Sequence, residues 1–178
     1  MIEVKVQSLG LDRTSNTPVV ILQEKEGSRV LPIWIGPGEA SAIAMELAGM
    51  KFSRPLTHDL FASVILGFGG SLQRVVITKV VENTYYAELF IQRGPDVITI
   101  DARPSDSIAI ALRMDAAIFT TDELLEHTSV EISEAGEGAS GIIPEPDPTT
   151  RGPSSLSAEE LRDYLRRMNP EDFGRFNP

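Results

Sequence analysis

Apolar and polar residues alternate over short stretches in two parts of the chain, a pattern typical of β-strands. The first stretch begins at Met1 and continues to Leu11, and turns rich in Ser, Asn, Pro and Gly separate it from two further apolar runs. A second group of three runs follows later, and tight turns again divide them. Each group predicts an antiparallel meander. The expected strands are 2–11, 19–22, 29–35, 72–81, 85–92, 97–101 and a short one at 117–120.

Helical spacing of apolar residues occurs between and after the two meanders. A helix is predicted over 37–47, with Pro and Glu39 in its first turn, where a missing N–H is harmless and the helix dipole favours a carboxylate. A second is predicted from Thr57, as N-cap, to about Phe68. A third opens at Arg103 and is apolar on every side, so we expect it to be buried. A short helix is expected through Leu124-Leu125. Meanders combined with helices predict an α+β domain.

The composition changes after residue 132. Residues 133–156 are rich in Gly, Pro, Ser and Glu, which predicts a disordered linker. Residues 157–178 begin with a capping box and continue with apolar residues at helical spacing. They predict a short amphipathic helix that folds back on the domain or docks on a protein partner. The expected organisation is therefore a domain at 1–132, a linker and a C-terminal helix with its tail.

Composition narrows the classes of function. The chain has no Cys, which excludes disulfides, thiolate-bound zinc and Cys nucleophiles. Neither a signal peptide nor a membrane-spanning stretch is visible, so we expect a cytoplasmic protein with no membrane contact. The net charge is −10, from 16 basic and 26 acidic residues. Nucleic-acid binders usually carry a basic patch, so contact with DNA or RNA is expected to be weak, local or assisted by a metal.

Two segments share one chemical design. Residues 54–59 and 103–106 each place an Arg before a Pro, then a hydroxyl residue at a helix start, then a carboxylate in the first turn. Helix N-termini bind anions, and Arg offers a charged two-pronged donor. Facing each other, the two corners would hold a phosphate, within one chain or across the interface of a homo-oligomer. The candidate substrate-binding residues are Arg54, Thr57, Arg103 and Ser105.

His58 and the neighbouring carboxylates supply candidate chemistry. His58 is suited to proton transfer near neutral pH. Mg²⁺ or Mn²⁺ prefers oxygen ligands, for which Asp59, Asp101 and Asp106 are the candidates, and no organic cofactor is predicted. The same residues also fit a purely structural interpretation, with hydroxyls as caps, carboxylates opposite helix dipoles and Arg residues in ion pairs. Spacing alone does not decide between the two.

Other candidate residues carry weaker signals. His127 fits a cation at a helix C-terminus better than a catalytic base. Trp34 lies between Ile33 and Ile35 in a strand pattern, which predicts a core or interface position. Tyr85 and Tyr86 are adjacent in a strand and face opposite sides, so at most one of them can stack on bases at a given surface.

Several blocks of the chain occur in the order found in one known family. The blocks Leu31–Gly36, Glu39-Ala40, Arg54-Pro55, Thr57–Leu60 and above all Ile100–Ala109 resemble the bifunctional nuclease (DNase/RNase) family. The resemblance implies a mixed, mainly antiparallel, barrel-like sheet with packed helices. It also implies nuclease activity on DNA and RNA. Combined with the paired Arg, His and carboxylates at the helix starts, it predicts hydrolysis of phosphodiester bonds with a divalent metal and little sequence preference. Residues that match its motifs and are candidates for catalysis are Glu39, His58, Asp59 and Asp106.

Two alternatives stay open at the level of sequence. One is a non-catalytic regulatory module that binds a small anion, a nucleotide or a partner protein, which the acidic composition favours. The other is a hydrolase of a small phosphate or sugar-phosphate substrate, which would use the same residues.

Overall fold

Seven strands form one sheet in the part of the chain that the computed structural model describes, residues 1–12 and 15–126. The first meander consists of β1 (Ile2–Asp12), β2 (Thr17–Glu24) and β3 (Val30–Trp34). The second consists of β4 (Gly70–Val81), β5 (Thr84–Arg93) and β6 (Asp96–Ala102). Both meanders lie where the alternation predicts them. The predicted linker, the C-terminal helix and His127 lie outside the described residues.

A short strand joins the two meanders. β7 (Ala117–Thr120) pairs antiparallel with β1 and parallel with β4, which gives the strand order β3-β2-β1-β7-β4-β5-β6. The sheet is therefore mixed and mainly antiparallel, as expected. It is not closed, because β3 and β6 are its edges. The predicted α+β class is confirmed.

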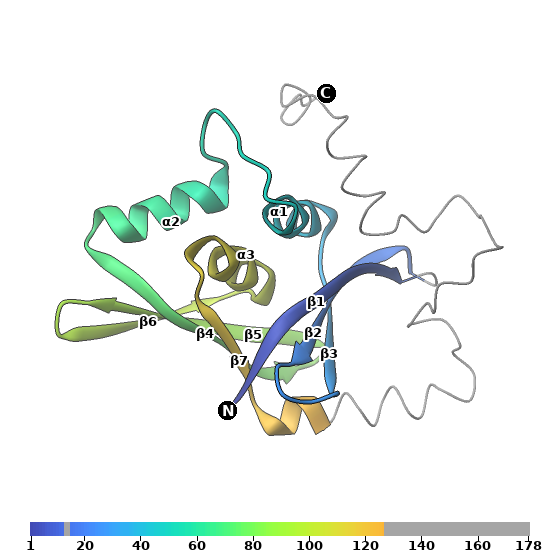
Figure 1. Ribbon diagram of the computed structural model, residues 1–178. Helices are drawn as coiled ribbons and strands as arrows, with labels where there is room; N and C mark the ends of the chain where they lie inside the picture. The colour runs from blue at the N-terminus through green and yellow to red at the C-terminus, as the bar shows by residue number, and fades with distance from the viewer. Residues whose placement is uncertain (13–14, 127–178) are drawn as a thin grey trace, which may run out of the picture.

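Three helices lie together on one side of the sheet (Figure 1). They are α1 (Pro37–Leu47), α2 (Thr57–Gly67) and α3 (Pro104–Met114), and a helical turn follows at 122–126. The predicted bounds agree with these, but the predicted caps are wrong. The N-caps are Leu56 and Arg103, so Thr57 is the first helical residue of α2 and Ser105 the second of α3. The Asp59 carboxylate accepts the Leu56 N–H at 2.9 Å, and Pro104 needs no N–H partner, so neither helix start uses a hydroxyl cap.

Helix α3 is the centre of the core. Ile108, Ala109 and Ala111 are fully buried, which confirms the prediction that a helix apolar on every side is enclosed by the rest of the fold. They belong to one cluster with inward-facing residues of both meanders, such as Leu22 and Leu89. Burying one Ile side chain stabilises the fold by about 1.5–3 kcal/mol. Because α3 packs against both α1 and α2, it fixes where these two helices begin relative to each other.

Helix α2 departs from the expected pattern of burial. Only Ala62 and Ile65 are buried. Of the apolar residues that predict the helix, Ile65 is buried and the other four are exposed, from 41% for Phe61 to 76% for Phe68; these four are Leu60, Phe61, Val64 and Phe68. The helical spacing therefore predicted the helix correctly, but most of its predicted apolar face does not pack against the core. None of the helices in the described segments is long and apolar enough to span a membrane.

Candidate active site

The first turns of all three helices converge on one cluster of charged side chains. Each helix has a carboxylate at its third residue, Glu39 in α1, Asp59 in α2 and Asp106 in α3. The positive end of a helix dipole favours a carboxylate at this position. Packing of α3 against α1 and α2 brings these carboxylates, 67 residues apart in sequence at the extremes (106 minus 39), into one neighbourhood.

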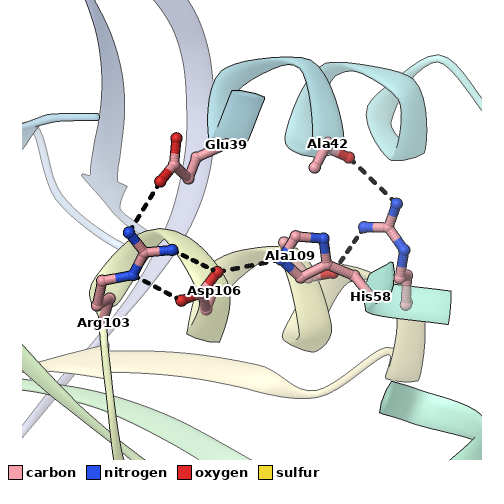
Figure 2. A network of polar contacts seen from close by, with 7 residues as sticks. Glu39, Ala42, His58, Arg103, Asp106 and Ala109 are labelled. Atoms are coloured by element: carbon pink, nitrogen blue, oxygen red, sulfur yellow. Dashed lines mark hydrogen bonds and ion pairs between the residues drawn. The ribbon is translucent and has the colours of Figure 1, made fainter. Parts of the chain in front are cut away.

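Arg103 links two of the helices. Its Nη1 donates to Glu39 Oε1 at 2.9 Å, its Nε to Asp106 Oδ2 at 2.8 Å and its Nη2 to Asp106 Oδ1 at 3.3 Å (Figure 2). Hydrogen bonding to Asp106 is the main reason that the pKa of Arg103 is raised, so the guanidinium stays charged. Arg carries five N–H donors, and these bonds use three. The side chain is 66% exposed, and the two remaining donors have no hydrogen-bond partner among residues 1–12 and 15–126.

His58 joins the same cluster through Asp106. Its Nε2 lies 3.2 Å from Asp106 Oδ1, and the His58 side chain is only 17% exposed (Figure 2). An ionised Asp106 fixes the tautomer in which Nε2 carries the proton, which leaves Nδ1 as a proton acceptor. Burial opposes ionisation of Asp106, but hydrogen bonds from Arg103 and His58 outweigh it and lower the pKa of this carboxyl. Asp106 therefore orients the histidine ring.

Arg113 is a residue of the site that no sequence pattern identified. Its side chain is 5% exposed and contacts all three helices. Nε donates to Asp59 Oδ1 in α2, Nη1 to the Ala109 carbonyl at 2.9 Å in α3 and Nη2 to the Ala42 carbonyl at 3.2 Å in α1. Figure 2 shows the bonds to the carbonyls of Ala42 and Ala109. The available signal was a lone cation in the last turn of α3, which is common at helix ends.

Asp59 forms an ion pair with the buried side chain of Arg113. Burial alone would raise the pKa of Asp59. Hydrogen bonds from Arg113 and from the Leu56 N–H together outweigh burial, so the pKa is lowered overall. Both oxygens already accept a hydrogen bond, Oδ1 from Arg113 and Oδ2 from Leu56. Asp59 thus fastens the start of α2, and the adjacent His58 with it, to α1 and α3.

The structure brings the two predicted corners together in one chain, but only in part. His58 from the first meets Asp106 and Arg103 from the second. Arg54 and Thr57 are exposed, and Arg54 makes no hydrogen bond or ion pair with a described residue. Asp101 lies opposite Glu88 in the β5–β6 pairing, on the sheet face away from the core.

The carboxylates predicted as metal ligands do not form one set. Asp59 faces Arg113, Asp106 faces Arg103 and His58, and Asp101 lies on the other face of the sheet. Within residues 1–12 and 15–126, no group of three or more His, Asp or Glu side chains is arranged to hold a metal ion. The donors nearest Asp106 are themselves cations or a histidine, which suits a bound anion better than Mg²⁺ or Mn²⁺.

A pocket of about 250 Å³ opens beside Arg103. Ser105, which is 6% exposed, is part of its wall, as is Glu39. Trp34 also lines it and is 45% exposed, so of the two expected positions the core is wrong and the interface stays a prediction. The indole Nε1 donates to Asp12 Oδ2 at 3.0 Å, which fixes the ring at the edge of the sheet. The remaining lining residues are Ile33, Ile35, Gly36, Asn83, Thr84, Tyr85 and Pro104.

Comparison with known proteins identifies the family of the chain. Residues 20–133 match the family model described as the bifunctional nuclease domain. An uncharacterized protein of Mycobacterium tuberculosis is 38% identical over 172 residues, 96% of this chain and 97% of that protein. Bifunctional nuclease 1 of Arabidopsis thaliana is 22% identical over 170 residues, 90% of this chain and 52% of that protein.

Bifunctional nuclease 2 of Oryza sativa subsp. japonica is 28% identical over 116 residues, 63% of this chain and 36% of that protein. The chain thus spans about half or less of these two plant proteins. The family match covers the second meander, α1, α2 and α3, and with them every residue of the charged cluster. The chain belongs to the bifunctional nuclease domain family.

Proposed function

We propose that this chain is a nuclease that hydrolyses phosphodiester bonds in DNA or RNA at the cluster of His58, Asp106 and Arg103. The observation that carries the proposal is the bond from His58 Nε2 to Asp106, combined with an exposed arginine on the same carboxylate. A proton acceptor oriented by a carboxylate, next to a cation with free donors, is the minimum needed to activate water against a phosphate.

Each residue has a defined role in the proposed reaction. The two free N–H groups of Arg103 hold the non-bridging oxygens of the phosphate and stabilise the charge that builds on them. His58 Nδ1 accepts the proton of the attacking water, a new P–O bond forms, and the P–O bond to the leaving oxygen breaks. The leaving oxygen takes a proton from solvent. Asp106 holds Nε2–H and stabilises the imidazolium that forms, as carboxylates do beside catalytic histidines.

Glu39 and Asp59 have supporting roles in this scheme. Glu39 accepts a hydrogen bond from Arg103 and holds the guanidinium over the start of α3. Asp59 anchors the turn that carries His58. No step of this scheme uses a metal, because Asp59 and Asp106 face arginines and Asp101 lies on the other face of the sheet. Use of Mg²⁺ or Mn²⁺ stays a prediction that a chelator tests directly.

The test compares the two histidines of the chain. Wild type, His58→Ala and His127→Ala are purified in parallel and assayed on single-stranded RNA and double-stranded DNA with Mg²⁺, Mn²⁺ or EDTA. Loss of a general base typically costs 10²- to 10⁴-fold in rate, so we expect a loss of about that size for His58→Ala only. His127→Ala controls for handling and for removal of a histidine as such.

Other outcomes separate the rival functions. Equal cleavage by wild type and His58→Ala would contradict the proposed site and indicate a contaminating nuclease. Binding without cleavage under every condition would favour a non-catalytic module for nucleotides or small anions. Cleavage of small phosphate esters in preference to strands would favour the small-substrate hydrolase. Cytoplasmic location, homo-oligomer formation and a protein partner for residues 157–178 stay predictions.

A further inference from the structure

We propose that the pocket beside Arg103 binds one base of a single-stranded nucleic acid, stacked on Trp34, with the adjacent phosphate on Arg103. The base subsite stands on the pocket itself, whereas the phosphate position rests on the proposed function. No charge attraction to the base is needed, because every base has a π-face that stacks on an aromatic ring.

Trp34 is placed and held as a stacking surface would need to be. It lies in the edge strand β3, two residues before the N-cap of α1, and is 45% exposed. The only polar atom of its side chain is paired with Asp12, which fixes the ring, and Trp34 is among the residues that line the pocket. An aromatic residue that is ordered before the ligand arrives loses little conformational entropy on binding.

The opposite wall of the pocket comes from the β4–β5 hairpin. Asn83, Thr84 and Tyr85 line it, and Glu82 and Asn83 have φ values of 48° and 59°, as the central residues of a tight hairpin turn do. An Asn amide can donate to and accept from the polar edge of a base. The residues that line the pocket therefore include an aromatic residue, an amide and the apolar Ile33 and Ile35.

The size of the pocket selects the form of the substrate. Sites for drug-sized molecules have volumes of roughly 300–1,000 Å³, so a pocket of about 250 Å³ suits a single nucleoside better than a base pair. A base can enter only when it is unpaired and unstacked. Glu39 and Arg103 at the pocket wall then meet the sugar–phosphate that follows. The proposal thus names single-stranded DNA or RNA as the substrate class.

The chain contains a single Trp, so the indole N–H signal of Trp34 in a ¹H–¹⁵N spectrum reports on this pocket alone. AMP and dAMP contain no phosphodiester bond and are titrated into the wild-type chain, with ribose 5-phosphate and deoxyribose 5-phosphate as matched ligands without a base. We expect the Trp34 signal to shift with the nucleotides and to stay in place with the sugar phosphates.

Variants provide a second, independent readout. Fluorescence anisotropy of a labelled single-stranded pentanucleotide is measured with wild type, Trp34→Ala and Trp34→Phe. We expect Trp34→Ala to weaken binding by roughly 5- to 150-fold, the range that corresponds to stacking of one base, and Trp34→Phe to retain most of it. The duplex of the same sequence is expected to bind more weakly than the single strand.

An indole signal that no nucleotide moves, or equal strand affinity in wild type and Trp34→Ala, would overturn the base subsite. Its failure is distinguishable from failure of the nuclease. Cleavage that depends on His58 with no role for Trp34 would leave the nuclease standing. A nucleotide-dependent shift without any cleavage would leave the subsite standing on a binding module.

Discussion

Replacing Arg113 by Met tests whether one buried guanidinium holds the site together. Met preserves much of the side-chain volume but has no donors, so the Asp59 carboxylate and the carbonyls of Ala42 and Ala109 lose a partner. Breaking a buried ion pair from one side costs about 3–5 kcal/mol. Asp59 is 31% exposed and water can solvate it in part, so we expect a loss near the lower end, about 3 kcal/mol.

For a domain of this size such a loss corresponds to a fall in Tm of roughly 10 °C. The free energy of unfolding is measured by urea titration followed by circular dichroism. Arg113→Lys serves as the matched control, since it keeps the charge but cannot reach a carboxylate and two carbonyls at once, and we expect an intermediate loss. Adding Asp59→Asn to Arg113→Met removes the unpaired charge of Asp59, though not that of Glu46, whose Oε2 lies 3.8 Å from the Arg113 Nε, and should recover part of the stability.

A loss below about 1 kcal/mol for Arg113→Met would refute this reasoning, because exposed ion pairs reach values of that size. So would a double variant that is no more stable than Arg113→Met. In either case Asp59 would not depend on Arg113, and the position of His58 would need another explanation.

Three further outcomes follow from the charged cluster. Asp106→Asn should fold normally but lower the cleavage rate by roughly 10²- to 10⁴-fold, since the amide does not stabilise the His58 imidazolium, and rates alongside circular dichroism spectra check this. Glu39→Gln keeps an oxygen that accepts from Arg103 but removes the negative charge, so it should strengthen binding of a labelled strand a fewfold; weaker binding would indicate that the charge of Glu39 is itself needed to hold Arg103. The pKa of Asp59 lies below its ordinary value of 3.8, so the unfolded chain takes up the proton first and the stabilisation, present above about pH 4, is lost as pH falls below 3.8. Urea titrations at pH 6 and pH 3 should therefore show a smaller acid loss for Asp59→Asn than for wild type.

Local patterns predicted the elements well because alternation, Pro and Gly act over a few residues. The strand and helix bounds agree with the structure, and the all-apolar stretch of α3 correctly identified a buried helix. The prediction of hydroxyl N-caps was wrong, and the reason is also local. An Asp at the third position can satisfy the N-cap N–H by itself, as Asp59 does for Leu56, and the hydroxyl of Thr57 is then not required.

Long-range contacts leave no such pattern. Arg54 and Arg103 share one motif, yet only Arg103 joins the site, because β6 leads directly into α3 and places its backbone, whereas Arg54 lies in the loop before α2. Trp34 and Arg103 line one pocket although 69 residues separate them in the sequence (103 minus 34). The contacts of Arg113 with Asp59, Ala42 and Ala109 likewise exist only once α1, α2 and α3 are packed together.

The net charge of −10 and the proposed contact through one arginine together set the salt dependence of binding. A protein that neutralises six to ten phosphates loses about 10³- to 10⁵-fold in affinity between 50 and 200 mM salt, whereas one phosphate contact on a single strand predicts a logarithmic slope of only about −0.7. Stacking on Trp34 adds affinity without adding slope, and salt also screens repulsion from the acidic surface. We therefore expect labelled-strand affinity to change by less than about fivefold over this range. A steep slope would mean that several cations beyond Arg103 hold the backbone, and the strand would then not be bound at a local site.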